Sequence, residues 1–267
     1  MSTLSRAVRD STVVARRNLI KIKRVPDLLV FTLLSPIMFV LLFVYVFGSA
    51  IPIEGVDYAQ FLMAGIFAQT VVFGATITGA GLAEDMQKGI IDRFRSLPMS
   101  RQAVLAGRTA SDVVNNVLVL IVMSITGLAV GWRITSSPLD AIVAYALLLL
   151  FAYAISWMMA YIGLLVPSPE VVNNASFLAI FPLTFIAETF VPTDGFPVAL
   201  RTFARWNPVS AVTQAAREGF GNTGGVPAPD TWSMQNPEIY TLIWVVIIIV
   251  VFAPLASRQY QRTTERG

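Results

Sequence analysis

The sequence predicts an all-α integral membrane protein with six transmembrane helices and both termini on the cytoplasmic side. Of its 267 residues, 55% are hydrophobic and only 13% are charged, whereas a soluble domain of this size needs far more charge to cover its surface. Six apolar stretches approach or exceed the length that crosses a bilayer. Neither Cys nor His occurs, which excludes disulfides, thiolate metal sites and the most common general base.

The N-terminal segment, residues 1–26, is polar and basic and precedes the first apolar run. Its apolar residues recur every three or four positions, and several cations follow the same spacing on another face. This pattern predicts a basic amphipathic helix on the anionic cytoplasmic surface of the membrane, and a solvated basic tail is the alternative. The cations assigned to this helix are Arg16, Arg17, Lys21 and Arg24.

The six spans belong to a single domain over residues 1–267 and are expected at about 28–48, 58–83, 103–130, 140–166, 171–191 and 239–256. Arg108 and Asp112 lie in the first turns of the third span, where they should snorkel or pair near the inner surface. Glu188 lies near the outer end of the fifth span. It is either a substrate or gating residue at the outer mouth, or a side chain in the headgroup region without a role.

A dense patch of charge, residues 84–101, separates the second and third spans. Ile90 or Ile91, Phe94 and Leu97 recur at helical spacing as one apolar stripe, and Pro98 ends the helix. We expect a short amphipathic helix that docks into a groove on a soluble partner, although the cations alone could serve only to set topology. The residues assigned to this contact are Glu84, Asp85, Gly89, Ile91, Arg93, Phe94, Arg95, Leu97 and Pro98.

The distribution of cations predicts the orientation. Of the 19 Lys and Arg residues, fifteen lie in the N-terminal segment, in residues 88–108 or in the C-terminal tail, and four lie on the other side. With six spans, both termini and the 84–101 stretch are therefore cytoplasmic. The long segment 192–237 is external.

The external segment is unusually apolar for a loop, and Asn207-Pro208 interrupts it. Two short helices that dip into the outer leaflet would fit, because 10–14 apolar residues cannot span a bilayer. Such helices either take part in an outer gate or only anchor the fold at the interface.

The chain lacks sequence motifs that would let it use ATP or an ion gradient to power transport. It contains no Gly-x-x-x-x-Gly-Lys-Ser/Thr phosphate-binding loop, no Gly-x-Gly-x-x-Gly run and no cluster of metal ligands. The spans also lack the paired intramembrane carboxylates that a proton-coupled pump would use. We therefore assign no catalytic, cofactor-binding or metal-binding residue in this chain.

The run from Gly89 to Arg101, Gly-Ile-Ile-Asp-Arg-Phe-Arg-Ser-Leu-Pro-Met-Ser-Arg, resembles a stretch of the permease subunits of bacterial ABC-2 type exporters. It is similar in particular to the actinobacterial daunorubicin/doxorubicin-resistance permeases. Arg16-Arg17-Asn18-Leu19, Arg24-Val-Pro26, and Asn207-Pro208 followed by Arg217 fit the same family pattern. The resemblance extends over the whole chain.

The resemblance implies a multi-pass protein of the bacterial cell membrane with the ABC-2 exporter fold. Two permease subunits, identical or related, would each rest on a separate ATPase subunit that binds ATP and Mg²⁺. Residues 84–97 would form the coupling helix that enters the ATPase, and the N-terminal helix would be the interface helix beside it. The cargo would be a hydrophobic drug, a lipid or a glycolipid moved outward from the cytoplasm or the inner leaflet, so the partners include lipids but no nucleic acid.

The expected pathway is the face between two permeases, formed by the first, second and fifth spans. Two other classes compete with this function: an ion-gradient-driven secondary transporter, and a membrane scaffold or assembly factor that moves no cargo. The side chains chosen as candidates for the pathway or the outer gate are Thr76, Thr78, Asn173, Asn174, Phe177, Phe181, Glu188, Asn207 and Pro208, although several could equally pack inside one subunit.

Overall fold

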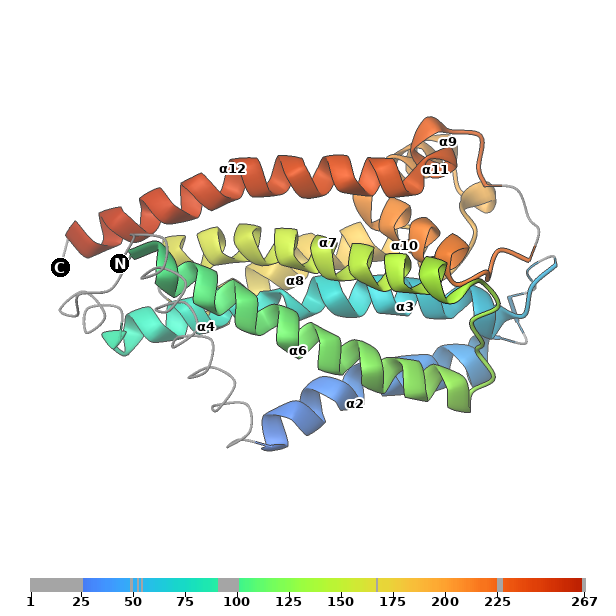
Figure 1. Cartoon of the computed structure of the whole chain (residues 1–267), viewed down its shortest axis with the longest axis horizontal. Helices are drawn as coiled ribbons and strands as arrows, with labels where there is room; N and C mark the ends of the chain where they lie inside the picture. The colour runs from blue at the N-terminus through green and yellow to red at the C-terminus, as the bar shows by residue number, and fades with distance from the viewer. Residues whose placement is uncertain are drawn as a thin grey trace.

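The computed structural model describes residues 26–48, 50, 51, 53, 55–90, 101–166, 168–224 and 228–265. Every regular element in these residues is helical. Figure 1 shows an elongated bundle in which the long helices run roughly along its long axis. The end of α12 and the facing ends of α4 and α6 lie at one end of the bundle, and α9, α10 and α11 lie at the other.

The first helix, α2, covers Pro26–Leu42 and continues directly as the π-helix η1 over Phe43–Phe47. Pro36 lies inside α2, as a proline can in a membrane helix when neighbouring groups satisfy the freed carbonyl. This helix lies at the lower edge of the bundle in Figure 1. Its exposed side chains include Leu34, Met38 and Tyr45, so much of it is free to face lipid or another protein.

The second span consists of two helices, α3 over Tyr58–Gly74 and α4 over Thr76–Gln87, with a turn at Ala75 between them. Small residues bring α4 against α7: a Cβ on Gly163 would meet the carbonyl oxygen of Gly79. Close backbone approach through glycine is a common way to pack membrane helices. α4 continues beyond the predicted end of this span, so Glu84 and Asp85 belong to α4.

The remaining long helices are α6 over Arg101–Ala129, α7 over Pro138–Leu165, α8 over Pro169–Phe185 and α12 over Pro237–Glu265. Both α7 and α8 begin with a serine cap followed by proline, a favourable start because the proline lacks the amide hydrogen that would be unpaired there. α8 ends before the predicted end of the fifth span. Glu188 therefore lies in the turn after α8 and not in a transmembrane helix.

Four helices of the described part of the chain are long and apolar enough to cross a membrane: Tyr58–Gln87, Leu105–Ala129, Pro138–Leu165 and Pro237–Arg262. The apolar helix Leu33–Phe47 and α8 are shorter. The prediction of an all-helical membrane protein is thus confirmed for the described residues.

The segment after α8 forms the short elements η2 over Thr193–Gly195, α9 over Val198–Arg205, α10 over Pro208–Gly219 and α11 over Trp232–Gln235. The side chain of Asn207 caps α10 by accepting a hydrogen bond from the amide of Val209 at 2.9 Å. α10 packs against α3, α7 and α12 and is buried along almost its whole length. Near its end, Phe220 packs edge-on against Phe67 and Trp132.

Candidate functional site

A cavity with a volume of about 580 Å³ lies between α2, α3, α4, α6 and α8. Its position is near the middle of the helices Tyr58–Gln87 and Leu105–Ala129. A cavity of this size is typical of sites for drug-sized ligands. Its lining consists of Ser35, Pro36, Phe39, Gln69, Thr70, Phe73, Gly74, Thr76, Ile77, Asn115, Asn116, Val119, Phe177, Phe181 and Phe185.

One wall of the cavity is aromatic. Phe177, Phe181 and Phe185 follow one another at a spacing of four along α8, with centroid distances of 5.0 and 4.1 Å between successive rings. Phe73 of α3 lies 6.2 Å from the ring of Phe177. These rings offer apolar faces that can stack with a flat ligand.

The wall formed by α3 and α6 carries three amide side chains. Gln69, Asn115 and Asn116 are 8%, 9% and 2% exposed. Asn116 Oδ1 is buried without a hydrogen-bond partner, while Asn116 Nδ2 donates to the carbonyl of Asp112 at 3.0 Å. Buried polar groups are normally paired, so Asn116 Oδ1 is an exceptional, unused hydrogen-bond acceptor on this wall.

The cavity includes some of the predicted pathway residues and not others. Thr76, Phe177 and Phe181 line it. Thr78 faces α6 instead, and Asn173 and Asn174 are exposed on α8 outside the lining. Gln69, Asn115 and Asn116 were not predicted. The signal that could have found them is the presence of polar amides inside apolar spans.

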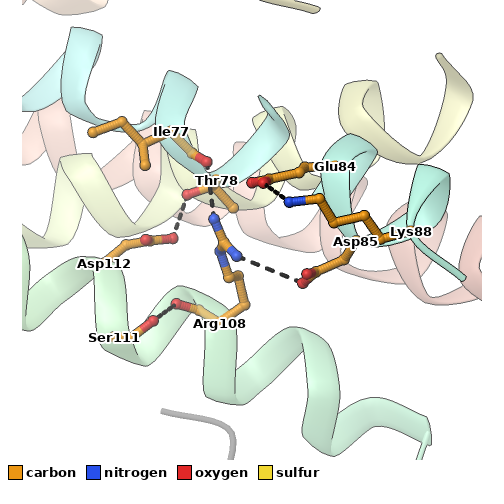
Figure 2. Close-up of polar contacts among 8 residues, drawn as sticks. All are labelled: Ile77, Thr78, Glu84, Asp85, Lys88, Arg108, Ser111 and Asp112. Atoms are coloured by element: carbon orange, nitrogen blue, oxygen red, sulfur yellow. Dashed lines mark hydrogen bonds and ion pairs between the residues drawn. The ribbon is translucent and has the colours of Figure 1, made fainter. Parts of the chain in front are cut away.

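A second polar cluster joins α4 to α6 toward the end of the bundle where the two helices approach the 84–101 stretch (Figure 2). Arg108 lies 3.7 Å from the carboxylate of Asp85, and both side chains are 11% exposed. Arg108 also donates to the carbonyl of Ile77 at 3.1 Å. One turn further along α6, Asp112 accepts a hydrogen bond from the hydroxyl of Thr78. We call Asp85, Arg108, Thr78 and Asp112 the α4–α6 clasp. The prediction that Arg108 would pair or snorkel is resolved in favour of pairing.

The described part of the 84–101 stretch differs from the prediction. Glu84 and Asp85 lie in the last turn of α4, where Glu84 pairs with Lys88 and its hydrogen bond raises the pKa of that ammonium. Gly89, with φ of 61°, then turns the chain, as glycine commonly does after a helix. A separate coupling helix therefore cannot begin at Glu84. Ile91, Arg93, Phe94, Arg95, Leu97 and Pro98 lie outside the described residues, as do Arg16, Arg17, Lys21 and Arg24.

At the opposite end, Arg217 of α10 is a buried cation. Its guanidinium lies 3.7 Å from the centre of the Phe61 ring and donates to Glu188 O at 3.0 Å, Gln214 Oε1 at 2.9 Å and Phe61 O at 3.4 Å. Burial lowers the pKa of Arg217 to about 10, which leaves it charged at neutral pH. Glu188 is itself 6% exposed, so its side chain is enclosed by protein.

Two further polar residues, Asn207 and Asn222, connect structural elements at the same end. Asn207 donates to the carbonyl of Leu183 at 2.6 Å, which ties the start of α10 to α8. Asn222 accepts a hydrogen bond from Trp132 Nε1 at 2.7 Å and donates to Gln60 Oε1 at 2.7 Å. Pro208 occupies the first turn of α10. These contacts join α3, α8, α10 and the α6–α7 loop.

Four helices that are long and apolar enough to cross a membrane, with a cavity at mid-span, are typical of multi-pass membrane transporters. The chain belongs to the ABC-2 type transporter family, whose model matches residues 10–220. It is 32% identical over 92% of its length to the daunorubicin resistance ABC transporter permease protein DrrB1 of Streptomyces coeruleorubidus, covering 83% of that protein. It is 25% identical over 79% of its length to a protein named as a transport permease, ycf38, of Cyanophora paradoxa, covering 73% of that protein. The chain is thus a permease subunit of an ABC exporter in the cell membrane.

Proposed function

We propose that this chain forms the transmembrane half of an exporter that carries a hydrophobic drug, lipid or glycolipid outward, paired with a second permease and driven by separate ATPase subunits. The observation that carries this proposal is the cavity of about 580 Å³ between α2, α3, α4, α6 and α8. Its aromatic wall gives a hydrophobic cargo a place to bind at mid-span. The relative named for daunorubicin resistance supports a drug as one cargo class.

In the proposed topology the chain crosses the membrane six times, with α2–η1 and α8 as the two crossings besides the four long apolar helices. α2 and η1 together cover Pro26–Phe47, which at 1.5 Å per residue is about 33 Å, enough for the hydrocarbon core. α8 is shorter, and the buried turn after Phe185 completes its crossing. Both termini and residues 84–101 are then cytoplasmic, and α9–α11 are external.

In this proposal the ATPase contacts the permease at residues 91–98, shortly after the end of α4, and transmits its movement there. Phe94 and Leu97 would anchor the coupling helix in a cleft of the ATPase, as large apolar side chains do at interface centres. The ATPase would bind ATP and Mg²⁺, and the N-terminal basic helix would lie beside it. The α4–α6 clasp supports this route because it ties together the two helices that flank the coupling segment.

The test uses the permease copurified and reconstituted with an ABC ATPase. Phe94→Asp should reduce copurification and abolish cargo-dependent stimulation of ATP hydrolysis, because a charge replaces the apolar anchor. The matched control is Phe203→Asp, at an exposed phenylalanine on α9, which should leave both unchanged. Normal copurification and turnover in Phe94→Asp would remove the coupling assignment.

The same vesicles separate the competing classes. An ATP-driven exporter loses cargo movement when ATP is removed and keeps it when ionophores collapse proton and sodium gradients. The opposite pattern would identify a secondary transporter. If ATP moves no drug or lipid even with the ATPase bound, the chain is a scaffold or assembly factor.

A further inference from the structure

We infer that a groove between α6 and α7 holds one acyl chain of a membrane phospholipid, and that Arg133 at the end of the groove binds the phosphate of the same lipid. The lipid belongs to the leaflet on the side of α9–α11. This inference goes beyond the proposed transport function, because the groove lies outside the cavity described above and its lipid is a bound component of the protein.

The groove has a volume of about 350 Å³ and an almost entirely apolar lining. The lining residues on α6 recur every three or four positions, so they form one stripe along that helix. Ile121, Ile125 and Leu128 of this stripe are exposed, so it faces the hydrocarbon of the membrane. The full lining consists of Val117, Leu120, Ile121, Ser124, Ile125, Leu128, Tyr145 and Leu149.

The two hydroxyl groups in the groove are already paired. The hydroxyl of Ser124 donates to the carbonyl of Leu120 at 2.7 Å, and its oxygen lies 2.7 Å from the hydroxyl oxygen of Tyr145. Neither hydroxyl needs a polar ligand. The groove therefore suits a hydrocarbon chain.

The length of the groove matches one leaflet. From Val117 to Leu128 it follows α6 for about 16 Å at 1.5 Å per residue, and half of the hydrocarbon core is about 15 Å. It occupies the half of α6 that leads into the α6–α7 loop. In that loop, the amide of Thr135 donates to the carbonyl of Phe220 after α10 at 2.9 Å. The groove thus opens toward the leaflet on the side of α9–α11.

A fixed cation lies at this end of the groove. Arg133 Nη1 donates to the carbonyls of Leu128, which lines the groove, and Trp132, each at 2.7 Å. The backbone of Arg133 is held as well: its amide donates to Gln60 Oε1 at 3.2 Å, and its carbonyl accepts from Asn222 Nδ2 at 2.9 Å. Its side chain is exposed, and Nε and Nη2 make no hydrogen bond within the described part of the chain. Two donors are therefore available to a membrane ligand.

A lipid phosphate satisfies these donors, because a guanidinium offers several N–H groups in a geometry that suits phosphate oxygens. None of the described lining residues is charged. The carboxylate of Asp140, at the start of α7, accepts a hydrogen bond from the hydroxyl of Ser137 at 2.7 Å. A molecule with a chain of one leaflet's length and a phosphate at its end matches the groove and Arg133 together.

The groove is separate from the cavity on the other side of α6. The cavity takes Asn115, Asn116 and Val119 from α6, whereas the groove takes residues such as Ile121 and Ile125. At 3.6 residues per turn, these two sets lie on roughly opposite faces of the helix. A lipid in the groove is therefore not placed where the proposed cargo binds.

The test uses the purified permease, delipidated in detergent. Dioleoyl phosphatidylglycerol should raise the thermal midpoint by about 3–5 °C, as expected for a ligand well above its dissociation constant. Dioleoylglycerol, which lacks the phosphate, and inorganic phosphate, which lacks the chains, should have no such effect. Native mass spectrometry should detect one retained phosphatidylglycerol per permease chain.

The first variant removes the phosphate contact. Arg133→Gln should lower the affinity for phosphatidylglycerol about tenfold, the size of effect expected for charge-assisted hydrogen bonds. Arg201→Gln is the matched control, because Arg201 lies on α9 outside the groove, and it should leave the affinity unchanged.

The second variant fills the groove. Ile121→Trp combined with Ile125→Trp should abolish retention of the lipid while leaving the contacts of Arg133 intact. The control is Val246→Trp combined with Val250→Trp, two exposed positions on α12, which should retain the lipid as the wild type does.

Four results would overturn the inference. The first is equal stabilisation by dioleoylglycerol, and the second is retention of the lipid in the groove-filling variant. The third is a lower thermal midpoint in Arg133→Gln with unchanged lipid affinity, which would leave Arg133 only as a cap on the carbonyls of α6. The fourth is a disulfide-linked dimer of Ile125→Cys in nanodiscs. The natural chain has no cysteine, so such a dimer would show that a second copy covers the groove.

Discussion

The guanidinium of Arg108 on α6 occupies the space in front of Gly81 on α4 in which any larger residue would place its Cβ. The absence of a side chain at Gly81 thus lets Arg108 reach both Asp85 and the carbonyl of Ile77 (Figure 2). The α4–α6 clasp depends on this pairing of one glycine with one arginine.

Gly81→Ala should therefore destabilise the protein by about 1–3 kcal/mol, because the methyl group displaces Arg108 from partly buried polar partners. This loss should outweigh the roughly 0.5–1 kcal/mol that alanine gains over glycine in a helix. The measurement is the thermal midpoint in detergent. Gly195→Ala is the control, since an added Cβ there has no atom within 4 Å.

The same clasp predicts that the effect of Gly81→Ala on stability changes sign when Arg108 is absent. In an Arg108→Ala background the added methyl group has nothing to displace, so Gly81→Ala should become neutral or stabilising. If Gly81→Ala costs the same with and without Arg108, the guanidinium is not what the glycine accommodates.

Asn222→Ala should cost about 2–3 kcal/mol of stability, because it leaves the buried indole of Trp132 without its hydrogen-bond partner and removes one of the two hydrogen bonds that Gln60 Oε1 accepts. Asn236→Ala is the comparison, since the Asn236 side chain donates one exposed bond to a nearby carbonyl. The two thermal midpoints should differ by several degrees. Equal midpoints would show that the Asn222 contacts contribute little.

Arg217→Lys should lower stability by about 2–4 kcal/mol, although it retains the charge. A lysine ammonium cannot reproduce the planar guanidinium that bonds three acceptors and lies over the Phe61 ring. The thermal midpoint checks this expectation, and an unchanged midpoint would contradict it.

The contribution of Arg217 to the stability of the protein should change with pH in one direction only. Its pKa in the folded protein, about 10, is lower than in the unfolded chain, so the folded state releases this proton first and stability rises with pH only from about pH 10 upward. The difference in thermal midpoint between the wild type and Arg217→Met should therefore stay constant between pH 6 and pH 8.5. A difference that changes in this window would show that another group controls it.

A cysteine at Thr223, in the loop after α10, should react with a membrane-impermeant maleimide added to intact cells. The natural chain has no cysteine, so the label reports one site. Lys88→Cys, at an exposed position directly after α4, should react only after permeabilisation. The reverse pattern would invert the proposed topology.

The all-helical fold was predictable because long apolar runs separated by polar segments leave few alternatives to membrane helices. The residues at which helices end were harder to predict. Hydropathy does not show where a chain turns inside a protein, so the end of α8 at Phe185 and the extension of α4 to Gln87 were missed. The turn at Ala75 was missed as well, since its neighbours Gly74 and Thr76 are unremarkable in a packed span.

The candidate site was predictable only in part. Thr76, Phe177 and Phe181 were chosen for polarity and span position, and the cavity includes all three. Gln69 and Asn115 give no periodic signal, and only the three-dimensional structure shows that both line the cavity. The burial of Arg217 was not predicted, because its partners Phe61 and Glu188 lie far from it in sequence.

The turn at Ala75 divides the second span at the level of the cavity. On the C-terminal side of this turn, the ion pair between Asp85 and Arg108 joins α4 to α6. On the N-terminal side, Arg217 of α10 contacts the ring and the carbonyl of Phe61 on α3. The part of the second span that lines the cavity is therefore held in place from both sides, by one arginine near each end. Loss of either arginine would release only one half of this span.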